Sequence, residues 1–214
     1  QAAVAVARVL AEADVGDDAQ GGHRLGDRPR RPLHDAVRVI GKLDFPDDHP
    51  MLDHFRFLKK HADRAHVTAK MTIPSPAVLH FRGGRKAISK EVYPDLEEFY
   101  ADLGKTYRKA VKAFYDAGCR YLQFDDTVWA YLCSQEELQK ARERGDNPDG
   151  LQQIYARIIN YALAERPADM VVTTHVCRGN FRSTWISSGG YEPVAETMLA
   201  GTNYDGYFLE YDSD

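Results

Sequence analysis

The sequence has few cysteines, no excess of positive charge and no long apolar run, and each absence excludes a class of protein. Three cysteines at irregular spacing do not make a disulfide framework, so we expect a reducing, cytoplasmic environment. A formal net charge of -4 gives no basic surface for nucleic acid. The apolar runs are far shorter than a membrane span. The N-terminus also lacks the basic region followed by an apolar stretch that is typical of a signal peptide.

The remaining composition is that of an ordinary globular protein, with 43% hydrophobic and 28% charged residues. The length of 214 residues suits one domain or part of a larger one. The beginning differs from the rest, because residues 1–13 are rich in Ala and Val whereas residues 16–34 are aperiodic and rich in Gly, Asp and Arg. We therefore separate a poorly patterned segment, residues 1–36, from a regular part, residues 37–214.

In the regular part, predicted strands and helices alternate along the chain. Strands are predicted at 37–41, 67–73, 121–125, 170–175 and 206–211. Helices are predicted at 47–60, 95–117, 134–145, 151–164 and 192–199. The clearest helix begins after Asp95, a plausible N-cap, and ends before Gly118. This alternation predicts a parallel sheet covered by helices.

Two architectures fit this order of elements, a doubly wound sheet and a (β/α)8 TIM barrel. The last three strands are short and nearly continuously apolar, as expected of strands that are buried on both faces. A full barrel takes ~250 residues, and this sequence has only about five recognisable strands. Asp214 follows the last of them without a covering helix. We therefore expect a TIM barrel that is truncated at its C-terminus.

Polar side chains that could bind a ligand or act in catalysis follow each of the last three strands. Asp125 and Asp126 end the first of these strands, His175 and Cys177 end the second, and Glu210 lies at the end of the third. In a barrel the active site lies at the carboxyl ends of the strands. These three strands would therefore bring two carboxylates, an imidazole and a thiol, and a further carboxylate to one rim.

The spacing of His175 and Cys177 favours a shared ligand. Residues i and i+2 of an extended segment point to the same side, so both could hold one metal ion. Imidazole, thiolate and carboxylate are the usual donors to zinc, and Glu210 would supply the carboxylate. A histidine bonded to the backbone beside a buried thiol is the alternative. For Asp125 and Asp126 the alternative is to cap the helix that follows.

Other residues carry weaker expectations. Arg178 could bind a carboxylate or phosphate, or it could lie in a solvated loop. Cys119 and Cys133 have no partner at metal-ligand spacing and are expected in the core. Three histidines on or near the first helix are expected at the surface: His54, His61 and His66.

Five stretches resemble one known family. They are MTIPSPAVLHFRGGR (71–85), YLQFDDTVWAYL (121–132), THVCRGNFRSTW (174–185), GGYEPVAE (189–196) and GYFLEYD (206–212). Together they resemble the catalytic domain of cobalamin-independent methionine synthase, and more closely its short, single-barrel relatives. The resemblance runs from about residue 37 to the end of the chain, and its motifs are most specific in the last hundred residues. It implies that residues 37–214 are part of a methionine-synthase-like TIM barrel.

The resemblance also implies a reaction, a cofactor and roles for residues. The family transfers a methyl group from methyltetrahydrofolate polyglutamate to the thiol of homocysteine, using zinc held by His, Cys, Glu and a second Cys. The first three ligands correspond to His175, Cys177 and Glu210, whereas the second Cys lies further along than Asp214. Asp125 corresponds to the residue that holds the homocysteine ammonium group, and we add Asp126 and Arg178 as candidate substrate-binding residues.

Three alternatives to a methionine-forming enzyme stay open. The same zinc site could methylate or alkylate another thiol, such as coenzyme M. A metal-free barrel of the uroporphyrinogen decarboxylase type is disfavoured by His175, Cys177 and Glu210, since that chemistry needs no zinc. The chain could also be an inactive fragment, whose open sheet edges would promote aggregation.

Overall fold

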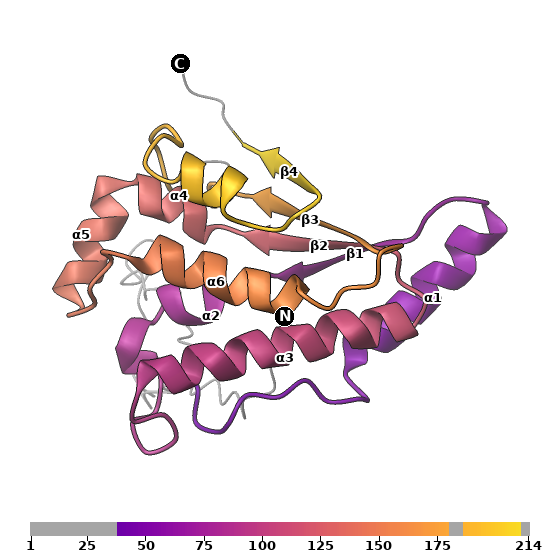
Figure 1. Ribbon diagram of the computed structural model, residues 1–214, viewed down its shortest axis with the longest axis horizontal. Coiled ribbons are helices and arrows are strands. Elements are labelled where there is room, and N and C mark those ends of the chain that lie inside the picture. The colour runs from indigo at the N-terminus through magenta and orange to yellow at the C-terminus, as the bar shows by residue number, and fades with distance from the viewer. Residues whose placement is uncertain (1–37, 180–185, 211–214) are drawn as a thin grey trace, which may run out of the picture.

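The computed structural model describes residues 38–179 and 186–210. Its centre is a parallel four-stranded sheet of mixed α/β architecture, in the order β1-β2-β3-β4 (Figure 1). The strands are β1 (Lys70–Pro74), β2 (Tyr121–Asp126), β3 (Val171–Val176) and β4 (Gly206–Leu209). The segment 1–36 lies outside the described residues, as do residues 180–185 and 211–212 of the family-like stretches.

Helices connect the strands, as the alternation in the sequence predicts. The α-helices are α1 (Pro50–Arg64), α2 (Val78–Phe81), α3 (Leu96–Asp116), α4 (Val128–Cys133), α5 (Gln135–Glu143) and α6 (Leu151–Leu163). Two single turns complete the set: the 3-10 turn η1 (Gly84–Ala87) and the π-helical turn η2 (Glu196–Ala200). In Figure 1, α3, α6 and η2 form a row along one side of the sheet. Within the described residues, no helix is long and apolar enough to cross a membrane.

Helix α3 shows why a helix with a cap, a long apolar stripe and a terminal glycine can be predicted from the sequence. Its N-cap is Asp95, whose side chain accepts a hydrogen bond from the backbone N–H of Glu97 at 3.0 Å. Its apolar side chains recur at helical spacing and are buried against the sheet; the ring of Tyr107, for example, lies 5.5 Å from that of Phe124 in β2. Gly118, which follows the helix, has a φ of 95°, a conformation that favours glycine.

Asp95→Ala is expected to lower the free energy of unfolding by about 1 kcal/mol, because it leaves the first turn of α3 without its side-chain acceptor. Asp95→Asn keeps a capping oxygen and is the matched control, expected within ~0.5 kcal/mol of the wild type. Urea unfolding followed by circular dichroism measures both differences. Equal stability of Asp95→Ala and wild type would show that this cap contributes nothing.

The two faces of the sheet have different surroundings. On the face toward the helices, Leu122, Phe124, Val172 and Val176 are buried. The opposite face carries the intervening residues of each strand, and Phe208 of β4 is 47% exposed. The prediction that the last strand is buried on both faces is therefore wrong, because within the described residues β4 pairs only with β3.

The sheet curls toward this second face. Lys70 lies in β1 and Phe208 in β4, at opposite edges of the sheet, which are roughly 14 Å apart if the sheet is flat. The Lys70 ammonium nevertheless lies 4.8 Å from the ring centre of Phe208 and 4.9 Å from that of Tyr121. Phe208 is also paired with His175, four residues beyond Val171, the position level with Lys70, so the two Cα atoms would be roughly 19 Å apart in a flat sheet. The two side chains make contact across this separation only if the sheet is curved. In the part of the chain that the structure describes, the curved sheet has four strands and is not a closed barrel.

Three other expectations need correction. The predicted strand at 37–41 is reduced to one bridge, between Val39 and Ile88. Three short helical elements, α2, η1 and α4, are absent from the helices that the sequence predicts. The helix predicted at 192–199 is only the turn at Glu196–Ala200. These are short elements, in which few residues repeat a pattern.

Candidate functional site

The strands β2, β3 and β4 have their carboxyl ends on the same side of the sheet (Figure 1). Three of the predicted site residues, Asp125, His175 and Glu210, meet there. Asp125 of β2 and His175 of β3 occupy paired positions in the parallel ladder. Their side chains meet, with Asp125 Oδ1 at 2.6 Å from His175 Nδ1. The Nδ1–H of a neutral imidazole would donate to this carboxylate, which leaves the lone pair of Nε2 on the other side of the ring.

Glu210 approaches the opposite nitrogen of the same ring. Its Oε1 lies 3.4 Å from His175 Nε2, so the imidazole stands between two carboxylates from neighbouring strands. All three side chains are partly exposed, so solvent or a ligand reaches them. The backbone N–H of Glu210 donates to the carbonyl of Val176 at 3.2 Å, which extends the β3–β4 ladder by one residue and fixes where Glu210 emerges.

Cys177 emerges on the same side as His175. Its backbone N–H donates to the carbonyl of Asp126 at 2.9 Å, which keeps the chain extended through His175 and Cys177. The sulfur accepts a hydrogen bond from the backbone N–H of Gly179 at 3.3 Å. Gly179 has a φ of 83°, which L side chains rarely adopt, so glycine lets the chain turn back on the sulfur.

The donor chemistry of this group fits zinc, although the side chains do not surround a common point. Across residues 38–179 and 186–210, no three His, Cys, Asp or Glu side chains form a group that could hold a metal ion. His175, Cys177 and Glu210 nevertheless offer the three donor types that zinc prefers. The contact of His175 with Asp125 is also the arrangement usual for a metal-bound histidine, whose second nitrogen donates to a carboxylate.

Asp126 points to the other face of the sheet and is fully buried. Its carboxylate accepts hydrogen bonds from the Ser75 hydroxyl and from the backbone N–H of Val128, the latter at 2.7 Å. Burial raises the pKa of Asp126 to about 6, against the opposing effect of these hydrogen bonds. These contacts favour the capping alternative, because both carboxylate oxygens bond to groups of the protein.

Arg178 is also buried, and two nitrogens of its side chain donate to main-chain carbonyls. Its Nε donates to the carbonyl of Glu210 at 2.9 Å and its Nη1 to the carbonyl of Gly189 at 2.8 Å. The expectation of a solvated loop at Arg178 is wrong, because the residue is only 6% exposed. Its expected role in substrate binding stays a prediction.

The other predicted residues lie where the sequence placed them. Cys119 and Cys133 are buried, and His54, His61 and His66 are exposed. Sequence reasoning missed Ser75 and Tyr191, which contact Asp126 and Glu210. The only available signal for Ser75 was its position between two prolines at the end of a strand.

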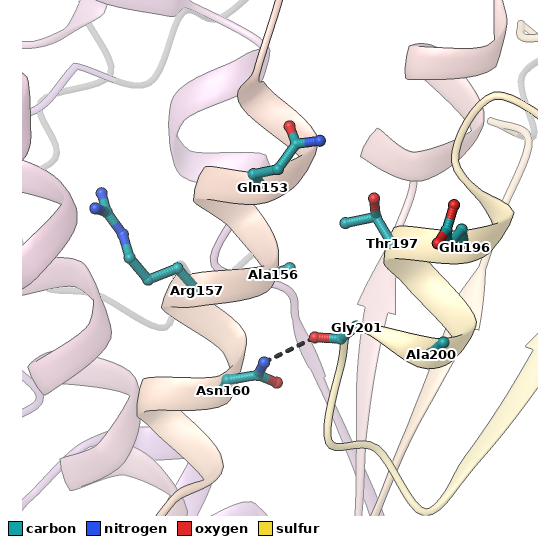
Figure 2. Close-up of a pocket in the computed structure, with 8 residues that line it drawn as sticks. All are labelled: Gln153, Ala156, Arg157, Asn160, Glu196, Thr197, Ala200 and Gly201. Carbon is teal, nitrogen blue, oxygen red and sulfur yellow. Dashed lines mark hydrogen bonds between the residues drawn. The ribbon is translucent and has the colours of Figure 1, made fainter.

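A hollow of about 770 Å³ lies apart from this group, between α6 and η2 (Figure 2). Arg157 and Asn160 line it from α6, and Glu196 and Thr197 line it from η2. Asn160 closes one end by donating to the carbonyl of Gly201 at 2.8 Å. The hollow belongs to the helical layer, and none of the predicted site residues lines it.

Known proteins similar to this chain include two curated relatives from Bacillus subtilis (strain 168). The uncharacterized protein YxjH is 52% identical over 179 residues, and the uncharacterized protein YxjG is 50% identical over 177 residues. The alignments cover 84% and 83% of this chain but 46% of each relative, so the chain spans about half the length of the relatives it matches. No family model matches the chain.

Two solved structures share the fold. A candidate vitamin B12-independent methionine synthase from Listeria monocytogenes matches with a TM-score of 0.67 and 48% identity, covering 82% of this chain and 48% of that one. The B12-independent methionine synthase from Shewanella sp. W3-18-1, in complex with selenomethionine, matches with a TM-score of 0.56 over 79% of this chain and 44% of that one. At 15% identity, the second match concerns the fold alone.

Proposed function

We propose that the chain is part of a zinc-dependent methyltransferase of the cobalamin-independent methionine synthase family, which methylates the thiol of homocysteine. One observation carries the proposal: His175 lies between Asp125 and Glu210 at the carboxyl ends of three parallel strands, with Cys177 two residues further on. The 48% identity to the Listeria monocytogenes protein supports the choice of family. The curvature of the sheet supports a barrel as the architecture of the whole protein.

Within this proposal each residue has a defined task. His175, Cys177 and Glu210 would hold the zinc ion, which when bound lowers the pKa of a substrate thiol and so favours a thiolate at neutral pH. Asp125 fixes the tautomer of His175 through its hydrogen bond to Nδ1. As a partly exposed carboxylate at the same rim, Asp125 also offers a charge to the ammonium group of homocysteine. Methyltetrahydrofolate would supply the methyl group.

Asp125→Asn is expected to weaken the binding of homocysteine without weakening the binding of other thiols. Homocysteine carries an ammonium group, whereas coenzyme M carries none. Loss of the carboxylate should therefore weaken the binding of homocysteine only. We expect its dissociation constant to rise ~10-fold or more, as for loss of a hydrogen bond to a charged group. Titration calorimetry with the zinc-loaded protein measures both thiols.

Coenzyme M is the internal control, because Asp125 also contacts His175 and its loss could disturb the zinc site. Damage to the zinc site would weaken both thiols equally, and that result would remove the ammonium-binding role. Tighter binding of coenzyme M than of homocysteine by the wild type would favour the alternative thiol substrate. Failure of the wild type to bind zinc would refute the proposed function.

A further inference from the structure

Arg178 connects the ends of β3 and β4 through both its main chain and its side chain. Its backbone N–H donates to Glu210 Oε2 at 2.9 Å, and its Nε donates to the carbonyl of the same residue at 2.9 Å. Its own carbonyl accepts the backbone N–H groups of Ile186 and Ser187, at 2.9 and 3.0 Å. With the bond from Nη1 to Gly189, Arg178 ties the segment after residue 185 to the strand ends.

Tyr191 is a second hydrogen-bond partner of the same carbonyl. Its hydroxyl donates to the carbonyl of Glu210 at 2.7 Å, and its ring lies 4.9 Å from the guanidinium carbon of Arg178. The carbonyl of Glu210 therefore accepts two side-chain donors, and the two donors also contact each other. A planar guanidinium over an aromatic face is a favourable arrangement, so each residue helps to hold the other in place.

We propose that Arg178 and Tyr191 are positioning residues for Glu210, an inference that rests on the proposed zinc function. Glu210 lies one residue beyond β4, so the sheet ladder alone does not fix its side chain. The two donors fix its main chain, and the Arg178 N–H holds Oε2. Oε1 is thereby left on the side of His175 Nε2.

This arrangement assigns Arg178 a task other than substrate binding. Nε and Nη1 of its side chain donate to main-chain carbonyls, so these two donors already have partners within the protein. Lysine in its place offers one ammonium group without the planar fork, and it cannot donate to both carbonyls in the same way. Loss of an outer partner of a metal ligand commonly costs 10–100-fold in metal affinity, which is the effect expected for either residue.

Tyr191→Phe removes one hydroxyl and keeps the ring over Arg178, so it tests the hydrogen bond alone. We expect zinc affinity, measured by competition with a chromogenic chelator, to fall ~10-fold. Arg178→Lys is expected to lower it at least as much, since both side-chain bonds are affected. The visible absorption of the cobalt-substituted protein should shift in both variants, because it reports the geometry around the metal.

Tyr115→Phe is the matched control. Its hydroxyl donates to Asp169 at 2.9 Å, at the end of α3 remote from Glu210, so zinc affinity should stay at the wild-type value. Circular dichroism of the metal-free variants confirms that they are folded at the assay temperature. Zinc binding by Tyr191→Phe and Arg178→Lys equal to that of wild type, or an equal fall in Tyr115→Phe, would overturn the positioning role and leave the zinc function standing. A wild type without zinc would overturn both.

Discussion

Cys177→Ala is expected to abolish the binding of zinc by a protein whose wild type binds one ion. The variant removes the only partly exposed thiol among the described residues, since Cys119 and Cys133 are buried. The sulfur is the softest of the three donors, and thiolate sulfur is among the usual ligands of zinc. Loss of this ligand should lower the zinc affinity by more than the ~10–100-fold lost when a residue that hydrogen-bonds to a metal ligand is removed.

Zinc content after dialysis, measured by atomic emission, tests this prediction directly. Cys119→Ala is the matched control, because it also removes one thiol but lies at the amino end of β2, bonded to the carbonyl of Tyr121. The control should retain the wild-type content. Stoichiometric zinc in both variants would show that the metal binds elsewhere, and no zinc in a folded wild type would refute the zinc site in this chain.

The sequence was sufficient for the elements whose pattern repeats over several turns or strands. Helix α3 has a capping Asp95, a long apolar stripe and Gly118 after its end, and it forms within one residue of the predicted bounds. Strands β2 and β3 combine apolar runs with polar ends, and so their carboxyl ends could be located. Because parallel strands end on the same side of a sheet, the fold class predicts that Asp125 and His175 share one rim. Their direct contact depends on the register of β2 and β3, which pairs the two residues.

Other features depend on contacts between distant residues, which no local pattern records. Helix α4 is buried on every side, so it has no polar face to give it a helical period. Arg178 was expected in a solvent-exposed or ligand-binding loop, but its partners Gly189 and Glu210 lie 11 and 32 residues away. The buried carboxylate of Asp126 accepts a hydrogen bond from the hydroxyl of Ser75, which lies 51 residues earlier in the chain.

His80 provides the clearest case of a residue that only the structure explains. It is 3% exposed and lies between two hydroxyls, with Nδ1 at 2.7 Å from Tyr155 and Nε2 at 3.1 Å from Tyr100. These tyrosines belong to α6 and α3, so the imidazole joins α2 to both long helices. Burial lowers the pKa of His80 to about 4, with the nearby Asp146 acting in the opposite direction. The neutral ring can donate to one hydroxyl and accept from the other.

The wild type is expected to lose about 3 kcal/mol of stability relative to His80→Gln as the pH falls from 7 to 4, because its pKa is depressed from 6.5 to about 4. For a histidine whose pKa is lowered in the folded state, the stabilisation is fully present when the pH is above the pKa of the unfolded chain. It is lost as the pH falls through the pKa of the folded state. The unfolded chain binds the proton first, which favours unfolding. His80→Gln should be less stable than wild type at pH 7, since it disturbs a packed core, and the difference should shrink on acidification.

Urea unfolding of both proteins at several pH values gives the difference, in which the titration of all other groups largely cancels. His54→Gln, at an exposed position of α1, is the matched control and should differ from wild type by less than ~0.5 kcal/mol at pH 7. A His80→Gln difference that stays constant from pH 7 to 4 would show that His80 binds its proton equally in both states. The contact of His80 with α3 and α6 would then stabilise the fold through packing alone and would have no part in its acid sensitivity.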